Sequence, residues 1–410
     1  MTDHESGWRR QLPVIGLLGA TGLSVTGNGI VNLAIPWLVL ERTGSAALAG
    51  LIAAATLGPM ALSSLLGGAL IDRWGRRRLS IGADILSGLA VAALPLLDRT
   101  LGLTGVTIAV LVALGAVFDG PGMAARESLR PDVARTSRTP LERINAWGEA
   151  LDGIGNIAAP GIGGVLIALV GASNTLWVTV AMFAGAVLLT TFTIPADVRG
   201  TEPPQRYVHA VLEGLRFVWR TPVLRGTGLT AMVLVMFLAP IPIVLTVVLQ
   251  RAGQPEQLGL VTAMFAVGGV AGAVVYGIVA HRLPRRPVLL WGLTFCSLGI
   301  AAFGLFDSVL GMTVLATLVG VAAAPVNPIT AVVMQEQTPE RLRGRVIGSV
   351  GSMALLAGPL GTTAAGLLVE NLGVAQTWLV VGAGCLLSAG YAALAPGMRD
   401  LSAPLARQMP

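Results

Sequence analysis

The sequence contains no lysine and few charged residues of any kind. Arginine supplies all 27 basic residues, and charged residues make up 12% of the 410-residue chain, about half the usual share in soluble domains. Apolar residues make up 54% of the chain, and its mean hydropathy is +0.77. This number of charged residues is too small to cover the surface of a globular protein. The composition therefore excludes an ordinary soluble protein and predicts an all-α integral membrane protein.

Cysteine and histidine are also scarce. The two cysteines, Cys296 and Cys385, lie in separate apolar runs, and the histidines, His4, His209 and His281, are scattered. This set excludes a disulfide framework and a metal site. A phosphate-binding loop that ends in Lys-Ser or Lys-Thr is impossible without lysine, so we expect no nucleotide partner. No His or Cys pair and no serine with a nearby base stands out, so an enzyme is the least favoured class.

Long apolar runs occupy most of the chain, and a run of about 20 residues is enough to cross a bilayer as a helix. Twelve such runs lie near residues 13–40, 46–71, 79–97, 102–125, 143–170, 173–194, 223–249, 257–280, 287–306, 309–334, 346–369 and 374–395. They predict twelve transmembrane helices in two six-helix bundles.

The arginines are distributed unevenly among the segments between these runs. If the N-terminus is cytoplasmic, 24 of them fall in cytoplasmic segments, and only Arg42, Arg99 and Arg251 fall outside. Cytoplasmic loops carry the excess of arginine, so both termini are expected inside. Because the arginines form no continuous stripe, the distribution also argues against a nucleic-acid partner.

The boundaries between the expected parts follow from these runs. We predict an N-terminal bundle over residues 1–194, a cytoplasmic linker over 195–222, a C-terminal bundle over 223–398 and a cytoplasmic tail over 399–410. Within the linker, apolar residues recur at helical spacing over 207–220, which predicts an amphipathic helix on the inner membrane surface.

The two halves repeat each other. At an offset of 209 residues, residues 68–78 align with 277–287, and residues 40–44 align with 249–253. At an offset of 199 residues, Thr139-Pro140 aligns with Thr338-Pro339, and Pro160 aligns with Pro359. Parallel six-helix repeats are typical of transporters that bind substrate between the halves near the membrane midplane.

The motifs within these repeats resemble those of the major facilitator superfamily. Residues 68–78, read as GALIDRWGRRR, match its signature loop between helices two and three. Further motifs resemble those of its drug-exporting branch, which includes the Tap-type multidrug efflux pumps and the macrolide and enterobactin exporters. These motifs are PWLVL at 36–40, RES at 126–128, RIN at 143–145 and LRGRV at 342–346.

This resemblance implies the major facilitator fold and a secondary active transporter in the bacterial cytoplasmic (inner) membrane. It implies export of amphiphilic drugs, and hence antibiotic resistance, by drug/proton antiport with rocker-switch alternating access. The proton gradient would supply the energy, and no cofactor would be needed. Two alternatives stay open: a dedicated exporter of a native metabolite (a siderophore or lipid-like molecule) and, less favoured, a non-transporting receptor or scaffold. Each chain supplies both halves, so we expect a monomer.

The signature loop is expected to act as a conformational latch on the cytoplasmic side. Gly75 permits a tight turn, and Asp72 can cap a neighbouring helix N-terminus, which the resemblance identifies as helix eleven. Arg76 would pair with an acid at the end of helix four, for which Glu127 is the candidate. The latch set is Gly68, Asp72, Arg73, Gly75, Arg76, Arg77 and Glu127. The alternative is that the arginines only fix topology.

A second motif lies in helix five and resembles the antiporter motif of the superfamily. It comprises Gly155, Ala159, Pro160, Gly163 and Gly164, with alanine at 159 where glycine is usual. Small residues allow close helix packing, and proline bends the helix. The resemblance links this motif to export, whereas ordinary small-residue packing is the alternative.

Four acids at membrane depth are proton-coupling candidates: Asp84, Asp119, Glu149 and Asp152. Ionisable residues inside the membrane are functional candidates by default. Asp152 lies deepest in its run, and Glu149 shares its helix face. Because burial penalises a charged carboxylate, these two are plausible proton carriers. Asp84 and Asp119 lie nearer the expected cytoplasmic ends, where pairing with loop arginines is an equally weighted alternative.

A drug-binding cavity needs adaptable apolar walls and a few polar groups. The candidates are Asn28, Trp37, Met232, Met236, Phe237, Phe265, Asn327 and Met353. Asn28 stands where the resembled branch often carries aspartate, and an amide cannot carry a proton. The acids and the absence of basic clusters in the runs favour small amphiphilic cations or zwitterions as substrates.

Overall fold

The structure is a computed structural model that describes residues 3–64, 67–100, 102–195, 207–306, 308–339, 342–399 and 401. Within these ranges the side chains of 3–9, 64, 67–69, 72, 207–212, 344, 352 and 355 are outside the description. All regular elements in the described part are helical. Within the described ranges, twelve helical spans are long and apolar enough to cross a membrane, which confirms the predicted number and the all-α fold class.

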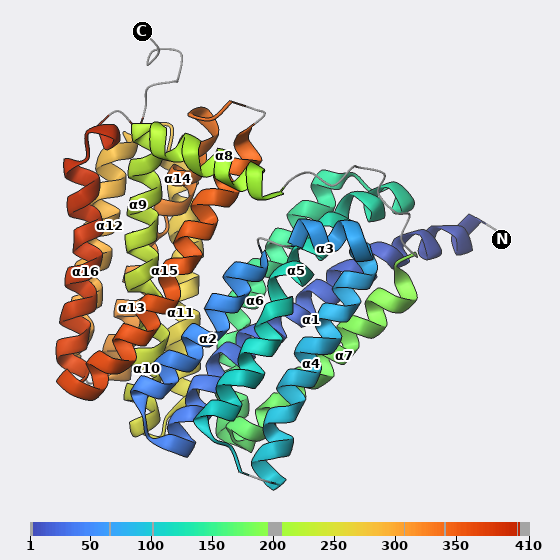
Figure 1. Cartoon of the computed structure of the whole chain (residues 1–410), viewed down its shortest axis with the longest axis horizontal. Helices are drawn as coiled ribbons and strands as arrows, with labels where there is room; N and C mark the ends of the chain where they lie inside the picture. Colours follow the sequence, from blue (N-terminus) through green and yellow to red (C-terminus); the bar gives the residue numbers. More distant parts are fainter. Residues whose placement is uncertain are drawn as a thin grey trace. The chain divides into compact units, whose positions relative to one another are not determined.

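In the described part of the first half of the chain, the helices are α1 to α7 (Figure 1). These are α1 (Asp3–Thr43), α2 (Ala46–Ser64), α3 (Gly67–Trp74), α4 (Arg76–Thr100), α5 (Gly105–Ser137), α6 (Leu141–Val170) and α7 (Ala172–Thr193). The remaining helices are α8 (Tyr207–Arg220), α9 (Pro222–Leu238), α10 (Ile241–Arg251), α11 (Pro255–Val279), α12 (Arg285–Ala302), η1 (Phe303–Leu305), α13 (Val309–Ala323), α14 (Val326–Glu336), α15 (Arg343–Leu372), α16 (Val374–Leu394) and η3 (Pro396–Met398).

One predicted boundary was wrong. In the run at 46–71, the described residues belong to α2 and α3, and residues 65 and 66 lie outside the description. Helix α5 extends twelve residues beyond the predicted end of its run at 125 and finishes at Ser137, so residues 126–128 lie inside a helix and not after it. The charged extension of α5 is helical because Arg126 and Leu129 are buried against neighbouring helices.

The chain divides into two compact units. Unit 1 comprises 1–44, 55–204 and 254–259, and unit 2 comprises 45–54, 205–253 and 260–410. The first turns of α2 therefore belong to unit 2, and the first turn of α11 belongs to unit 1. The repeat offset of 209 relates the starts of these two segments, residues 45 and 254, so the same part of each repeat is exchanged.

Helix α1 is the packing centre of unit 1. Glycines bring it close to α7, since a Cβ on Gly16 would meet Thr193 and one on Gly27 would meet Thr179. This order shows that α1 and α7 are antiparallel. On another face, α1 runs parallel to α6, with Gly29 against Ala159. Close approach of backbones is how membrane helices gain van der Waals contact.

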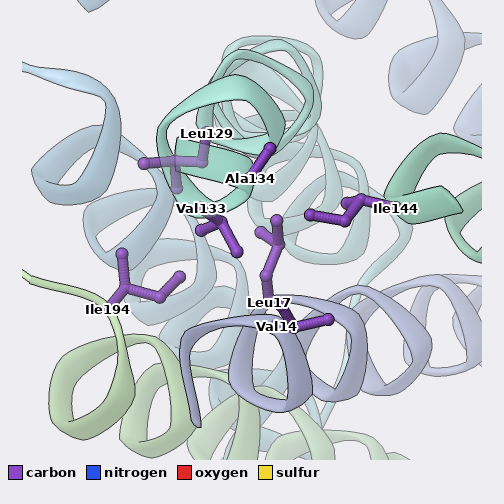
Figure 2. Packing of buried hydrophobic residues seen from close by; sticks show 7 residues of the cluster. All are labelled: Val14, Leu17, Leu129, Val133, Ala134, Ile144 and Ile194. Carbon is purple, nitrogen blue, oxygen red and sulfur yellow. The ribbon is translucent and has the colours of Figure 1, made fainter. Parts of the chain in front are cut away.

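One end of unit 1 is held by a cluster of seven buried hydrophobic residues (Figure 2). The cluster is made of Val14, Leu17, Leu129, Val133, Ala134, Ile144 and Ile194. Figure 2 shows side chains from α1, α5, α6 and the end of α7 converging on one space. The cluster therefore fixes the C-terminal extension of α5 against the start of α1 and α6.

Two spans of unit 2 are interrupted at prolines. Helix α9 ends at Leu238 and α10 begins at Ile241, immediately after Pro240; α13 ends at Ala323 and α14 begins at Val326, immediately after Pro325. Proline removes a backbone donor and collides with the preceding turn. These interruptions were not predicted from the sequence, although the prolines could have indicated them.

Residues Tyr207–Arg220 form a helix, α8, over the range in which the apolar spacing predicted one; its place on the inner membrane surface stays a prediction. Its apolar side does not simply face a bilayer, however. Val218 is fully buried with Leu342, Val346 and Val350 of unit 2, and Gly214 lies against the backbone of α15. The described part of α8 is thus packed onto the start of α15, a partner that sequence periodicity alone does not identify.

Candidate functional site

Residues of unit 1 line a partly open cavity of about 270 Å³, with contributions from α1, α2, α4, α5, α6 and α7. Its polar and charged lining residues are Thr21, Asn28, Asn32, Thr56, Ser87, Asp119, Arg126, Glu127, Arg130, Asp152 and Asn156. Its apolar and small lining residues are Val25, Gly29, Val31, Ile35, Leu57, Met60, Ala90, Val91, Leu94, Leu111, Val112, Gly115, Ala116, Met123 and Phe183. The cavity is therefore amphiphilic and lies inside one unit.

Helix α5 presents one continuous face to this cavity. Its lining residues recur at the three- and four-residue spacing of a helix face, and their polarity changes along the helix. From Leu111 to Ala116 they are apolar or small, and from Arg126 to Arg130 they are charged. Asp119 lies between the two parts. Helix α4 is antiparallel to α5, since Ala90 contacts Gly115 and Ala83 contacts Gly122; its apolar lining residues therefore accompany the apolar part of α5.

Asp84 forms a buried ion pair with Arg126. One guanidinium nitrogen of Arg126, Nη1, lies 2.8 and 2.9 Å from the two carboxylate oxygens of Asp84, and the two side chains are only 9% and 2% exposed. Ser24 Oγ donates a third hydrogen bond, at 3.1 Å. Of the two interpretations left open for Asp84, this geometry matches pairing with an arginine, although Arg126 lies in a helix and not in a loop.

Asp119 has a different environment. Its Oδ1 accepts a 2.7 Å hydrogen bond from Ser87 Oγ, and no ion pair joins Asp119 to an arginine among the described residues. The nearest arginine along its helix face, Arg126, is already bound to Asp84. Asp119 is therefore a carboxylate at the cavity wall with one neutral donor.

The two acids of α6 share one arginine. Arg130 Nη1 lies 3.3 Å from Glu149 Oε1, and Arg130 Nη2 lies 3.7 Å from Asp152 Oδ2. The expectation that both acids are buried was wrong for Glu149, whose side chain is 73% exposed, because it lies on the outer edge of the Arg130 pair. Asp152 is 35% exposed and lines the cavity, whereas Glu149 does not.

The predicted cavity residues divide between the two units. Asn28 lines the unit 1 cavity, whereas Trp37 is buried and is absent from its lining. The other six candidates, Met232, Met236, Phe237, Phe265, Asn327 and Met353, belong to unit 2. Met236, Phe237 and Asn327 flank the helix interruptions at Pro240 and Pro325. A role of these six in substrate binding stays a prediction.

The predicted pairing of Arg76 with Glu127 was wrong. Arg76 Nη1 instead lies 2.7 Å from Asp132 Oδ2, which is further along α5 because that helix extends to Ser137. The repeat has the same device in unit 2. Arg285, at the offset of 209, binds both carboxylate oxygens of Glu336 at 2.5 and 2.9 Å. Each arginine thus links two helices of its own unit, α4 to α5 in unit 1 and α12 to α14 in unit 2.

The following arginine of each repeat binds the end of another helix. Arg77 Nη2 donates to the carbonyl of Thr191 at 2.6 Å, near the end of α7. Arg286, again at the offset of 209, donates to the carbonyl of Ala393 at 2.9 Å, near the end of α16. Carbonyls in the last helical turn have no partner within the helix, so these arginines cap helix ends.

The rest of the predicted latch is described only in part. Gly75 has φ of +85°, as its expected turn requires, and Arg73 and Glu127 are exposed. Glu127 also lines the cavity. The surroundings of Gly68 and the side chain of Asp72 lie outside the description, so the expected contact of Asp72 with helix eleven stays a prediction.

The motif in α6 makes close contacts in two directions. Gly155 and Gly163 approach α1, where an added Cβ would lie 2.7 Å from Val25 and 3.2 Å from Leu33. Gly164 approaches the first turn of α11, where an added Cβ would lie 2.5 Å from the carbonyl oxygen of Pro255. Ordinary close packing therefore accounts for its small residues; a link to export stays a prediction.

Sequence reasoning missed three polar groups of the site. Arg126 and Arg130 were assigned to a cytoplasmic loop, and Ser87 was not singled out. The spacing of Asp119, Arg126 and Arg130 along one helix face and the apolar residues between them could have indicated that the helix continued. Among the described residues, no group of three His, Cys, Asp or Glu could hold a metal ion.

The sequence matches the family model of the Major Facilitator Superfamily over residues 17–253 and 241–400. The chain belongs to this superfamily. It is 36% identical to the multidrug efflux pump Tap of Mycolicibacterium fortuitum over 399 residues, covering 95% of this chain and 97% of that protein. It is also 26% identical to the Escherichia coli enterobactin exporter EntS over 329 residues, covering 80% and 78% of the two chains.

The fold agrees with this assignment. The nucleoside transporter NupG, in its D323A mutant, superposes with a TM-score of 0.79 at 14% sequence identity, covering 93% of this chain and 99% of that one. At such low identity the likeness supports the major facilitator fold and not a shared substrate. The chain is thus a multi-pass membrane transporter of the major facilitator superfamily, and it is not an enzyme.

Proposed function

We propose that this protein exports amphiphilic drugs from the cytoplasm in exchange for protons. The observation that carries the proposal is the 36% identity to the multidrug efflux pump Tap, which spans 95% of the chain. The unit 1 cavity adds independent support. It joins an apolar wall to a group of carboxylates, as a site for molecules with an apolar body and a polar end requires.

The mechanism we propose is rocker-switch alternating access between the two repeat-related bundles. Repeats of this kind in secondary transporters move against each other around a substrate site. The carboxylates of unit 1 would take up protons from outside and release them inside, so the proton gradient would drive export. We place the protein in the bacterial cytoplasmic membrane with both termini inside, as the arginine distribution favours, and propose that it works as a monomer without a cofactor.

Accumulation of a fluorescent cationic dye tests the proposal. Cells that lack their own efflux pumps would express this protein or carry an empty vector, each with and without a protonophore. We expect lower dye accumulation only in the expressing cells, and loss of that difference with the protonophore. Export that persists with the protonophore would contradict proton coupling.

Dye accumulation equal to the empty vector, with the protein shown in the membrane, would contradict drug export. It would favour a second function, export of a native metabolite. The similarity to the enterobactin exporter EntS over 80% of the chain is the observation in favour of that function. Comparison of metabolites in the medium of expressing and non-expressing cells would then identify the substrate.

A further inference from the structure

Helix α8 has two different faces along its described part. Gly214 and Val218 are buried against the start of α15, whereas Arg216, Trp219 and Arg220 are exposed. Residues three and four apart lie on the same side of a helix, so these three exposed residues form one face, which we call the basic face. Because α15 covers the apolar side of α8, the basic face is the side on which a further partner can bind.

The arginines near this face are not neutralised by a carboxylate. Glu213, the nearest acid in the sequence, binds Arg345 of α15. Among the described residues, no ion pair includes Arg216, Arg220 or Arg225. By contrast, the arginines that begin α4 and α12 are each bound by a carboxylate. This end of α8 therefore carries positive charge that is available to an anionic ligand.

The basic face lies close to the start of a membrane span. This span begins at Pro222, directly after α8, and Figure 1 shows α8 running across the end of unit 2 where α9 begins. Arg225 in the first turn of α9 donates through Nη1 to the carbonyl oxygen of Trp219 at 3.4 Å. The last turn of α8 is thus held at the level where the span begins. Trp219 is 45% exposed there, as is typical of tryptophans at a membrane–water interface.

Three arginines beside an exposed tryptophan match the chemistry of a phospholipid headgroup. A guanidinium group donates paired hydrogen bonds to phosphate oxygens, and an indole N–H can donate to the same polar layer while its ring contacts apolar groups. Basic residues close to a bilayer attract lipids that carry a net negative charge. A nucleic acid would need a longer stripe of basic residues, so this surface favours an anionic lipid.

We propose that the basic face of α8, together with Arg225, binds the headgroup phosphate of an anionic phospholipid. The phosphate lies among Arg216, Arg220 and Arg225, and the indole of Trp219 lies beside the headgroup. The lipid covers the charged side of α8 while α15 covers its apolar side, so the helix is held from both sides. The inference goes beyond drug/proton exchange and does not depend on it. The proposed orientation of the chain places this lipid in the inner leaflet.

Lipid binding to the purified full-length protein tests the site without a transport measurement. The protein in neutral detergent would be titrated with dioleoylphosphatidylglycerol, or with zwitterionic dioleoylphosphatidylcholine for comparison, and bound lipid would be counted by native mass spectrometry. We expect the wild type to bind phosphatidylglycerol more tightly. An arginine close to an anionic headgroup contributes about fivefold in affinity, so the double variant Arg216→Gln, Arg220→Gln should bind phosphatidylglycerol about 25-fold more weakly.

Two further double variants make the result specific. Arg282→Gln, Arg399→Gln changes the net charge equally and removes two exposed arginines of unit 2 that lie outside α8 and α9. It should bind phosphatidylglycerol as the wild type does. Arg216→Lys, Arg220→Lys retains the charge of the basic face and should retain most of the affinity.

Thermal stability provides a second readout and a folding control. A ligand that binds only the folded protein raises its thermal midpoint. Phosphatidylglycerol should raise the midpoint of the wild type more than phosphatidylcholine does, and this difference should be absent from Arg216→Gln, Arg220→Gln. Without added lipid the two proteins should have the same midpoint, because neither arginine forms a described ion pair.

Several results would overturn the site. One is phosphatidylglycerol binding that is unchanged in Arg216→Gln, Arg220→Gln, and another is an equal loss in Arg282→Gln, Arg399→Gln. Equal binding of the two lipids by the wild type would also contradict it. Polyglutamate binding that depends on Arg216 and Arg220, without a preference for phosphatidylglycerol, would assign the basic face to a soluble acidic partner and overturn the lipid.

The outcomes also separate this inference from the proposed export. Phosphatidylglycerol binding that depends on the two arginines of the basic face, without dye export from cells, would support the site and contradict drug export. Proton-driven dye export by the wild type, with lipid binding unaltered in Arg216→Gln, Arg220→Gln, would leave the proposed function standing and overturn the inference.

Discussion

At the scale of single residues, the sequence singled out acids that the structure buries or places at the cavity wall, but it did not identify their partners. Asp84, Asp119 and Asp152 were recognisable because carboxylates are rare in apolar runs. Asp84 is bound by Arg126 and Asp119 by Ser87, and these pairings depend on the antiparallel alignment of α4 and α5. A linear pattern carries no information about which residue of a neighbouring helix lies opposite, so the distinct environments of the acids could not be predicted.

The buried pair between Asp84 and Arg126 leads to a first prediction. Arg126→Gln leaves the Asp84 carboxylate buried without its cation, which costs about 3–5 kcal/mol in comparable pairs. We expect a marked fall in the thermal midpoint of the purified protein. A thiol-reactive dye can report unfolding, because the two cysteines of the chain, Cys296 and Cys385, are buried and free.

Arg135→Gln is the matched control for this prediction. Arg135 also pairs with a carboxylate of a membrane-embedded helix, Asp132, but its side chain is 78% exposed. Exposed pairs contribute about 0–1 kcal/mol, so the midpoint should barely change. Equal effects of the two substitutions would mean that burial of the Asp84–Arg126 pair has no energetic importance.

At the scale of elements, the length of α5 is the main difference from expectation. The apolar run ended near 125, but the helix continues to Ser137, because burial of Leu129 and Val133 compensates for the charged residues between them (Figure 2). This extension places Arg126 and Arg130 at the cavity and moves the partner of Arg76 to Asp132. A window of hydropathy averages over such a mixed helix and cannot detect its buried face.

The capping arginines of the repeat lead to a second prediction. Arg77→Gln and Arg286→Gln each remove a charged donor from carbonyls near the end of α7 or α16. Hydrogen bonds to charged groups contribute about 1.5–3 kcal/mol. We expect both variants to have a lower thermal midpoint, by similar amounts, since the contacts are repeat-related.

Arg73→Gln provides the comparison, because Arg73 belongs to the same loop and is exposed. It should leave the midpoint within error of the wild type. If Arg73→Gln lowered the thermal midpoint as much as Arg77→Gln, the arginines would stabilise the protein through their total charge and not through the two helix caps.

The close approach of α6 to the start of α11 leads to a third prediction. A Cβ on Gly164 would lie 2.5 Å from the carbonyl oxygen of Pro255, and one on Gly259 would lie 2.4 Å from that of Pro160. Gly164→Ala should therefore force the two helices apart and destabilise the protein by about 1–3 kcal/mol. Gly161→Ala on the same helix is the control, since its Cβ would meet nothing within 4 Å.

A double-mutant cycle sharpens this test. Gly164→Ala and Gly259→Ala disturb one helix crossing, so the combined variant should cost less than the sum of the two single changes. Strict additivity in thermal midpoints, or a Gly161→Ala effect as large as that of Gly164→Ala, would show that the crossing does not depend on these glycines.

At the scale of the whole molecule, the repeat was the strongest signal in the sequence. The offset of 209 residues relates Arg76 to Arg285 and Arg77 to Arg286, and the members of each pair make equivalent contacts. It also relates Gly44 to Gly253, which have φ of +66° and +67°. The sequence therefore predicted the number of spans and their repeat. It did not predict the exchange of residues 45–54 and 254–259 between the units, which depends on contacts between distant helices.

The orientation of the molecule in the membrane leads to a fourth prediction. Thr100 and Thr136 are exposed residues near the ends of α4 and α5, and each hydroxyl donates to the carbonyl four residues earlier. The two helices are antiparallel, so these threonines lie at opposite ends of unit 1. The arginine distribution places Thr100 outside and Thr136 inside the cell. Wild-type protein should not react with a membrane-impermeant maleimide, because its two cysteines are buried.

We expect the maleimide to label Thr100→Cys in intact cells, and to label Thr136→Cys only after the membrane is permeabilised. Both threonines are exposed and make the same hydrogen bond within their helix, and labelling of Thr136→Cys after permeabilisation shows that this position is reactive. The reverse pattern would show that the chain is inserted with its termini outside, and proton-driven export would then have to run in the opposite direction. Labelling of both variants in intact cells would contradict the assignment of α5, the helix between the two positions, as a membrane-spanning helix, since such a helix separates its two ends by about 30 Å of hydrocarbon.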